Sequence, residues 1–210
     1  MIKILIADDH SVVRKGVKHI ISEFFEKVVA HEAVNSAEVI ERIRKDDYDL
    51  VLLDIAMPGK DGLETLKEIK SERQKLPVLI LSMYPEEQFA LRAMKSGASG
   101  YLTKDSIPEE LIKAIQKIIK GGKYVSESFS DELLVSMDRD VEQLPHENLS
   151  DREYQVMLMI ASGKTRKEIA EKLFLSVKTV STYRTRILEK MELKTNADLT
   201  NYVNKHNLVV

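Results

Sequence analysis

The feature that most constrains the fold is an alternation of two apolar patterns through the first 120 residues. Short continuous apolar runs, typical of strands buried on both faces, alternate with segments of helical period. The predicted strands are Ile2–Ala7, Val28–Val34, Leu50–Leu53, Val78–Leu81 and Gly100–Leu102. The predicted helices are Val12–Phe25, Ala37–Lys45, Leu63–Lys70, Glu86–Ser96 and Glu109–Ile119. Five strand–helix repeats predict an α/β domain, a five-stranded parallel sheet with helices on both faces.

The α/β pattern ends near residue 121. Ser106-Ile107-Pro108-Glu109 reads as a capping box that opens the fifth helix, and Gly121-Gly122 closes it. Residues 122–147 show neither period, so we interpret them as a linker in which Asp131–Met137 forms one or two helical turns. The predicted domains are therefore residues 1–121 and residues 148–210.

Residues 148–210 have a purely helical pattern. Capping boxes at Ser150–Glu153 and Thr165–Glu168 open two helices, and Ser176 caps a third that runs to about Met191. A fourth helix is predicted over Ala197–Lys205. The pattern indicates an all-α domain of four helices.

Composition narrows the class of protein. The chain has no cysteine, which excludes disulfides and cysteine-based metal sites, and no apolar run approaches the ~20 residues of a membrane span. The apolar N-terminus runs directly into Asp8-Asp9, unlike a signal peptide, so we expect a cytoplasmic protein. Residues 148–210 carry 11 Lys/Arg and 7 Asp/Glu, whereas the preceding 147 carry 21 and 27, which suggests two domains with different partners.

Polar side chains directly follow four of the predicted strands. They are Asp8 and Asp9, Asp54, Ser82, and Thr103 with Lys104. Because the carboxyl ends of parallel strands meet at one edge of the sheet, these groups are expected to converge. Singly each has an ordinary explanation, since an Asp pair often opens a helix and a lone lysine is usually solvated. Their combination favours a site.

The chemistry of this set indicates phosphoryl transfer. Three close carboxylates repel one another unless a cation compensates, and oxygen ligands suit Mg²⁺. The lysine ammonium supplies a point charge for a phosphoryl oxygen. A carboxylate nucleophile, Mg²⁺ and lysine together predict an aspartyl-phosphate intermediate.

These residues resemble the receiver domain of two-component response regulators, a flavodoxin-like fold. The matching residues are Asp8-Asp9, Asp54-Ile55-Ala56-Met57-Pro58, Gly62, Ser82 and Tyr101-Leu102-Thr103-Lys104. The resemblance implies that Asp54 is a phosphoacceptor that receives its phosphoryl group from a sensor histidine kinase. It also implies that Mg²⁺ is bound by Asp9, Asp54 and the backbone carbonyl of Ala56, with Asp8 acting through water.

The same resemblance assigns the phosphoryl-binding and switch residues. Ser82 and Lys104 would hold phosphoryl oxygens, and Tyr101 would be an aromatic switch that moves with Ser82; simple packing is the alternative for Tyr101. Ser82 replaces the commoner threonine, and Asp105 stands where many receivers have proline. We expect His10 and His19 on helix faces rather than as ligands.

An enzyme is the first competing interpretation. A phosphatase or phosphotransferase of the haloacid-dehalogenase type predicts a second Asp two residues after the nucleophile, where this chain has Ala56. Without that general base an aspartyl phosphate would last long enough to signal. We therefore predict that the chain is not an enzyme.

The third C-terminal helix has two contrasting faces. Val180, Ile187 and Met191 gather on one side. The opposite side and its edges carry Lys178, Ser181, Thr182, Thr185 and Arg186. Such a helix suits insertion into the major groove of DNA, although a solvated face would look the same. Arg184 falls on the apolar side, and we expect it to reach solvent or pair with a carboxylate.

The preceding helix, Arg166–Leu173, is joined by the turn Phe174-Leu175-Ser176. That spacing fits a helix-turn-helix, although the turn lacks the glycine often found there. Lys164, Arg166 and Lys167 would then lie near DNA phosphates and give salt-sensitive affinity.

Residues 148–210 resemble the LuxR-type domain of the NarL/FixJ family. The matching residues are Leu149 to Glu153, Ile160 to Lys164, Glu168-Ile169-Ala170, Leu173 and Ser176 to Tyr183. The resemblance implies base contacts from Lys178, Ser181, Thr182 and Thr185, and dimerisation on DNA through the last helix. Met191-Glu192-Leu193 stands where a Leu-Gly pair is common, so we expect a slightly looser turn.

Together these features predict a phosphorylation-dependent transcription regulator. Its expected partners are a sensor histidine kinase, double-stranded promoter DNA with inverted or direct half-sites, and a second copy on activation. We expect no membrane partner. A protein-interaction module whose C-terminal helices bind a partner helix is the remaining alternative, which the basic balance after residue 147 disfavours.

Overall fold

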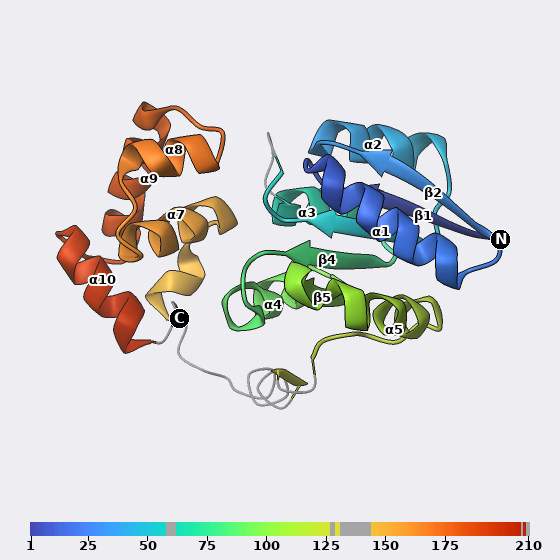
Figure 1. Cartoon of the computed structure of the whole chain (residues 1–210). Helices are drawn as coiled ribbons and strands as arrows, with labels where there is room; N and C mark the ends of the chain where they lie inside the picture. The colour runs from blue at the N-terminus through green and yellow to red at the C-terminus, as the bar shows by residue number, and fades with distance from the viewer. Residues whose placement is uncertain (58–61, 127–128, 131–143, 207, 209–210) are drawn as a thin grey trace. The chain divides into compact units, whose positions relative to one another are not determined.

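The computed structural model describes residues 1–57, 62–126, 129–130, 144–206 and 208 (Figure 1). The chain forms two compact units, Met1–Met137 and Asp138–Val210, which are described separately. The predicted helical turns at Asp131–Met137 lie outside the described residues.

The first unit contains one parallel sheet with strand order β2-β1-β3-β4-β5. Its strands are β1 (Ile2–Ala7), β2 (Val28–Ala33), β3 (Leu50–Asp54), β4 (Val78–Ser82) and β5 (Gly100–Thr103). Three of them extend one residue beyond the predicted ends, so that Asp54, Ser82 and Thr103 belong to the strands. The predicted five-stranded parallel sheet is confirmed.

Helices cover both faces of this sheet (Figure 1). They are α1 (Ser11–Phe24), α2 (Ser36–Lys45), α3 (Gly62–Glu72), α4 (Glu86–Lys95) and α5 (Ile107–Ile119). Helices α1 and α5 pack together on one face, α2 and α3 on the other, and α4 contacts β5. This is the flavodoxin-like arrangement.

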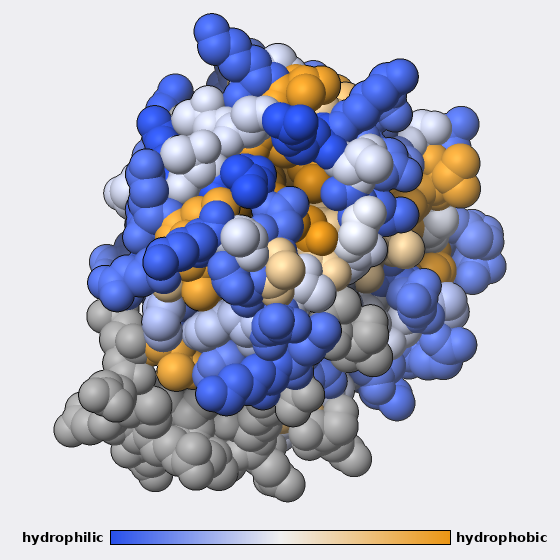
Figure 2. All heavy atoms as spheres, turned by 90° about the vertical axis from the view of Figure 1, so that its left-hand side faces the viewer, coloured by the Kyte–Doolittle hydropathy of each residue, from blue (hydrophilic) through white to orange (hydrophobic). Residues whose placement is uncertain are grey.

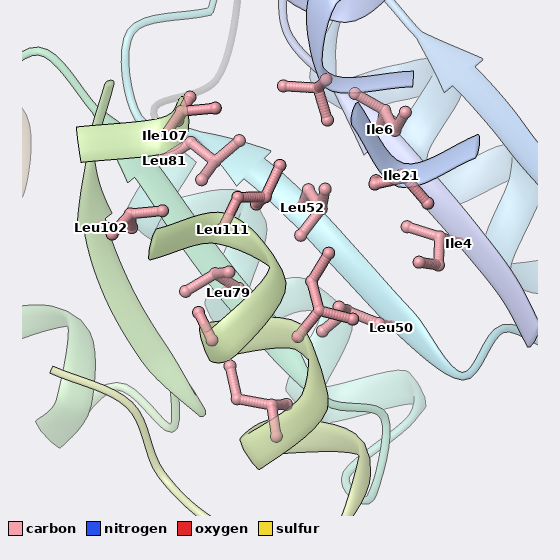
Figure 3. Packing of buried hydrophobic residues seen from close by; sticks show 14 residues of the cluster. Ile4, Ile6, Ile21, Leu50, Leu52, Leu79, Leu81, Leu102, Ile107 and Leu111 are labelled. Carbon is pink, nitrogen blue, oxygen red and sulfur yellow. The ribbon is translucent and has the colours of Figure 1, made fainter. Parts of the chain in front are cut away.

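The core between the sheet, α1 and α5 is built from alternate strand residues (Figure 3). It contains Ile4, Ile6, Leu50, Leu52, Leu79, Leu81 and Leu102 from the strands, with Val17, Ile21, Leu111 and Ile115 among the helical residues. Each fully buried aliphatic side chain stabilises the fold by about 1.5–3 kcal/mol. The core holds the strand ends, and therefore the polar groups that follow them, in fixed positions.

The predicted capping box at Ser106 is wrong. Ser106 is the N-cap residue but has helical dihedrals (φ −88°, ψ 0°) and makes no side-chain cap bond, because a 3₁₀ turn, Lys104–Ser106, leads into α5. Its hydroxyl pairs instead with Thr103 Oγ1 at 2.8 Å. The other end of α5 is as predicted: Gly121 has φ +86°, and the Gly122 N–H donates to the Lys117 carbonyl.

Two glycines give a matched stability test. A Cβ on Gly62 would lie 2.4 Å from Ile55 Cα and 2.5 Å from the Asp54 carbonyl oxygen, whereas one on Gly16 within α1 would meet nothing within 4 Å. We expect Gly62→Ala to destabilise the chain by roughly 2–3 kcal/mol. Gly16→Ala should stabilise it by about 0.5–1 kcal/mol. Urea denaturation followed by circular dichroism measures both, and equal effects would contradict this account.

The second unit is helical, as predicted. It contains η2 (Pro145–Asn148), α7 (Asp151–Ala161), α8 (Arg166–Lys172), α9 (Val177–Lys190) and α10 (Asn196–Lys205). Capping boxes form at Ser150 and Thr165, and Ser176 caps α9 by accepting the Thr179 N–H. Across the part of the chain that the structure describes, no helix is both long and apolar enough to cross a membrane.

Non-glycine residues adopt the left-handed conformation at both turns that lack the usual glycine. Phe174, between α8 and α9, has φ +53°, and Glu192, between α9 and α10, has φ +56°. The second turn keeps its hydrogen bond from the Leu193 N–H to the Leu188 carbonyl at 2.8 Å, so it is not loosened as predicted. The cost is backbone strain of about 1 kcal/mol or more at each residue.

Candidate acidic site and candidate nucleic-acid interface

The sheet edge brings the predicted acidic residues together around one lysine. Lys104 Nζ, just beyond β5, lies 2.7 Å from Asp8 Oδ2 and 2.8 Å from Asp54 Oδ2. Asp8 follows β1 and Asp54 ends β3, so three strands contribute to the cluster. All three side chains are almost completely buried. The convergence predicted from the strand ends is confirmed for these residues.

The site is electrostatically unbalanced. Burial raises the pKa of Asp54, and the nearby Asp8 carboxylate raises it further, while Lys104 opposes both. Burial alone would lower the pKa of Lys104, but the charges and hydrogen bonds of Asp54 and Asp8 outweigh it and raise that pKa. The lysine therefore stays protonated and cannot neutralise two buried carboxylates and Asp9 alone.

The donor set fits a divalent cation. Ligand atoms of Asp8, Asp9, His10 and Asp54 all lie within 4.8 Å of one another. Asp8 Oδ2 and Asp9 Oδ1 are buried oxygens that Lys104 Nζ and His10 Nδ1 approach, each to 2.7 Å. Carboxylate oxygens in excess over local positive charge are what Mg²⁺ binds.

Ala56 is placed next to this cluster. Its N–H donates to Asp54 Oδ1 over 3.1 Å, which fixes the carboxylate from the main chain. Ala56 offers no side-chain base, so the position two residues after Asp54 lacks the carboxylate that a haloacid-dehalogenase-type enzyme requires.

Two residues near the site were not predicted. His10 precedes α1 and its Nδ1 lies 2.7 Å from Asp9 Oδ1, so placing it on a helix face was wrong, whereas His19 is exposed on α1 as expected. Arg14, one turn into α1, donates to the Asp8 and Asp9 carbonyls at 2.8 and 3.2 Å. The sequence signal that could have identified Arg14 was a basic residue about one helical turn after the Asp pair.

The hydroxyl and aromatic residues form a second layer beside the acidic cluster. Ser82 is completely buried, and its Oγ accepts the Tyr84 N–H over 3.0 Å. Tyr101 is also completely buried, and its hydroxyl donates to the Tyr84 carbonyl over 2.9 Å. Burial strongly raises the Tyr101 pKa, with the Ser82 hydroxyl opposing that shift. Ser82 and Tyr101 are therefore linked through the segment that follows β4.

In the second unit, α9 buries one face and exposes the other. Val180, Ile187 and Met191 are buried, as the helical wheel predicts. The side chains predicted to contact DNA are exposed or half-buried: Lys164, Arg166, Lys167, Lys178, Ser181, Thr182, Thr185 and Arg186. Figure 2, which faces the C-terminal helices, shows mainly hydrophilic side chains with smaller hydrophobic areas between them.

The hydroxyls on α9 already donate within the helix. Thr182 and Thr185 donate to the carbonyls four residues earlier, at 3.1 and 3.2 Å, and Ser181 donates to Val177 O at 3.0 Å. Arg166 reaches from α8 to Ser181 Oγ over 3.4 Å. The two helices therefore present one continuous polar surface.

Polar contacts connect neighbouring helices of the second unit. Arg152 donates to Gln155 Oε1 and to the Leu173 carbonyl at the end of α8. Of the two predicted alternatives for Arg184, the carboxylate pair is absent from the described contacts: its Nε makes an exposed hydrogen bond to Asn196 Oδ1 at 2.6 Å, because Asn196 begins α10 directly beside it. These bonds connect α7 to the end of α8 and α9 to α10.

The fold and both sites define a class of protein, a receiver domain joined to a helix-turn-helix domain. Comparison with protein families agrees. Residues 4–116 match the response regulator receiver domain, and residues 147–203 match the bacterial regulatory proteins of the luxR family. The chain belongs to the NarL/FixJ-type response regulators, a family of DNA-binding transcription regulators rather than enzymes.

Similar proteins match over nearly their full length. The chain is 33% identical to the response regulator UvrY of Escherichia coli K12, over 99% of this chain and 96% of UvrY. It is 34% identical to the oxygen regulatory protein NreC of Staphylococcus carnosus, over 99% of each. Among solved structures it resembles an RcsB–DNA complex, with 28% identity, a TM-score of 0.58, and coverage of 100% of this chain and 99% of RcsB.

Proposed function

We propose that Asp54 accepts a phosphoryl group from a phosphohistidine of a sensor histidine kinase and thereby controls promoter binding by the C-terminal unit. The observation that carries this proposal is the convergence of Lys104 on Asp8 and Asp54 from three separate strands. Burying two carboxylates against one ammonium, with the Asp9 carboxylate close by, is costly, which favours a functional role for the cluster over a purely structural one.

Each residue of the site has a role in this transfer. An Asp54 carboxylate oxygen forms a bond to phosphorus as the P–N bond of the phosphohistidine breaks, and the departing imidazole retains the electron pair. Lys104 and Ser82 bind phosphoryl oxygens. Asp9, Asp54, the Ala56 carbonyl and, through water, Asp8 would hold Mg²⁺, which supplies charge neutralisation when bound.

The second unit is proposed to bind double-stranded DNA with α9 in the major groove. Lys178, Ser181, Thr182, Thr185 and Arg186 lie on the exposed side of α9 and would face base edges and the adjacent backbone. Lys164, Arg166 and Lys167 would contact phosphates. Solved structures of RcsB show dimers bound to DNA, which supports a dimer on inverted or direct half-sites here. We expect the chain to act in the cytoplasm, where promoter DNA lies.

Domain boundaries follow from the same assignment. Residues 1–121 would be the receiver domain, 122–147 the linker and 148–210 the DNA-binding domain. In the unphosphorylated chain, DNA binding would be weak, and phosphorylation would shift a two-state equilibrium towards the competent dimer.

The proposal is tested by DNA titration with and without beryllofluoride, a phosphoryl analogue, plus Mg²⁺. We expect affinity for a target duplex to rise about tenfold or more and the chain to dimerise. The apparent affinity is proportional to the fraction of protein in the DNA-binding state, which the analogue increases. Sedimentation and fluorescence anisotropy measure the two effects. Unchanged affinity and an unchanged monomer would refute the regulatory link.

A further inference from the structure

The first residues after α5 are attached to the sheet. Tyr124 forms a parallel bridge with Gly100. The Tyr124 N–H donates to the Ser99 carbonyl, and the Tyr101 N–H donates to the Tyr124 carbonyl, both over 2.9 Å. Strand β5 lies at one end of the sheet order, so Tyr124 pairs with an edge that would otherwise present unpaired backbone groups.

Gly100 permits this close approach. A Cβ at that position would lie 2.6 Å from the Tyr124 carbonyl oxygen. The Tyr124 side chain packs against the hydrophobic core, and Lys117 Nζ of α5 lies 5.8 Å from its ring centroid. The pairing is therefore supported by backbone, glycine and side-chain contacts together.

A buried carboxylate holds the same segment two residues later. Glu86, in the first turn of α4, is only 8% exposed. Its carboxylate accepts the Ser126 N–H over 3.2 Å and also accepts the Ser126 hydroxyl. Burial raises the Glu86 pKa, and the bonds from Ser126 oppose this. A buried carboxylate needs such partners, so Glu86 and Ser126 stabilise each other's positions.

Ser126 also begins the next part of the chain. Its Oγ accepts the Phe129 N–H over 3.3 Å, and its carbonyl accepts the Ser130 hydroxyl over 2.9 Å. Phe129 is 4% exposed. The serine therefore connects α4 to residues further along the predicted linker.

The attachments of Tyr124 and Ser126 both lie close to the proposed switch residues Ser82 and Tyr101. Tyr101 donates its N–H to Tyr124 and its hydroxyl to the Tyr84 carbonyl. Tyr84 donates its own N–H to Ser82 and stands two residues before Glu86. A movement of Ser82 towards a phosphoryl group would break the bond to Tyr84 and disturb the hydroxyl bond of Tyr101.

We propose that residues 123–126 form a strap that fastens the linker to β5 and α4 in the resting chain, and that Glu86 and Ser126 are its positioning residues. Phosphorylation of Asp54 releases the strap through Ser82, Tyr84 and Tyr101. The inference rests on the proposed function, because it names the segment through which that site acts. Physically, residues 123–126 have two arrangements, fastened and released, and phosphorylation of Asp54 shifts the equilibrium between them.

Hydrogen exchange of the full chain tests the release. In the resting wild type we expect the Tyr124 amide to exchange slowly. Beryllofluoride with Mg²⁺ should accelerate its exchange about tenfold, because exchange follows the local opening equilibrium. Mass spectrometry of peptides covering residues 122–130, with the β1 peptide as an internal reference, gives the measurement. Equal Tyr124 protection in both states would overturn the proposal.

Substitutions test the positioning residues. Ser126→Ala and Glu86→Gln should each accelerate Tyr124 exchange about tenfold without the analogue, since each weakens a hydrogen bond to a charged group. They should also reduce the gain in DNA affinity that the analogue produces. Glu87→Gln, an exposed change in the same helical turn, is the matched control and should behave as wild type. Unchanged exchange in both strap variants would overturn the assignment.

The two proposals fail in different ways. If the analogue raises wild-type DNA affinity while Tyr124 protection stays constant, the strap is wrong and the proposed function stands. If Tyr124 exchange accelerates with the analogue while DNA affinity does not change, the strap release is supported and the proposed control of DNA binding fails.

Discussion

Asp54→Asn will abolish uptake of a phosphoryl group from acetyl phosphate. The amide has nearly the size of the carboxylate but lacks the nucleophilic oxygen, so we expect acyl-phosphate formation to fall at least about a hundredfold. The substitution would also leave Lys104 paired with Asp8, whose Oδ2 lies 2.7 Å away, so the site should remain folded. Phosphate-affinity electrophoresis measures the product, and its cleavage by hydroxylamine identifies an acyl phosphate.

Asp47→Asn is the matched control for this change. Asp47 is 93% exposed and pairs with Arg73 at the surface, so its replacement should leave phosphorylation unchanged. Asp9→Asn keeps the nucleophile but removes a proposed Mg²⁺ ligand, and it should raise the Mg²⁺ concentration needed for the reaction. If the Asp54→Asn chain is phosphorylated on Asp8 or Asp9 to the wild-type level, the assignment of Asp54 is refuted.

The acidic site could be predicted because its position depends mainly on topology. Buried parallel strands give unambiguous apolar runs, and their carboxyl ends must share an edge, so the sequence pattern alone brings Asp8, Asp54 and Lys104 together. The same reasoning places Ser82 beside them, whereas Tyr101, within β5, was assigned only through the resemblance to receiver domains. Sequence patterns predict a site best where regular strands determine the sheet edge at which the site residues lie.

Contacts that depend on irregular backbone were missed. Ser106 failed as a cap because the 3₁₀ turn before α5 sets its dihedrals, which no residue spacing reveals. The pairing of Tyr124 with β5 depends on where the chain turns after Gly121, and Ser126 looked like an ordinary linker serine. Arg14 was missed because it contacts backbone carbonyls, which residue spacing alone does not indicate, and His10 because it lies before the first turn of α1 rather than on a helix face.

Removing the three basic side chains around the start of α8 will weaken DNA binding without changing its sequence preference. Lys164, Arg166 and Lys167 are exposed and lie outside the apolar contacts of the second unit, so alanine at all three should leave the fold intact. We expect affinity to fall about a hundredfold or more on target and scrambled duplexes alike. The slope of log affinity against log salt should become less steep by about 0.9 for each phosphate that the variant no longer neutralises.

Thr182→Ala with Thr185→Ala should instead weaken binding in a way that depends on the DNA sequence. Both side chains lie on the exposed face of α9, and their removal should reduce binding to the target duplex by about tenfold while leaving scrambled DNA and the salt slope unchanged. Lys194→Ala, which removes an exposed charge from the α9–α10 turn, is the control for net charge. Fluorescence anisotropy across a salt series separates these cases. If the double threonine variant binds both duplexes equally more weakly, base reading by α9 is refuted. If Lys194→Ala weakens binding as much as the triple variant does, net charge alone, rather than phosphate contacts near α8, sets the affinity.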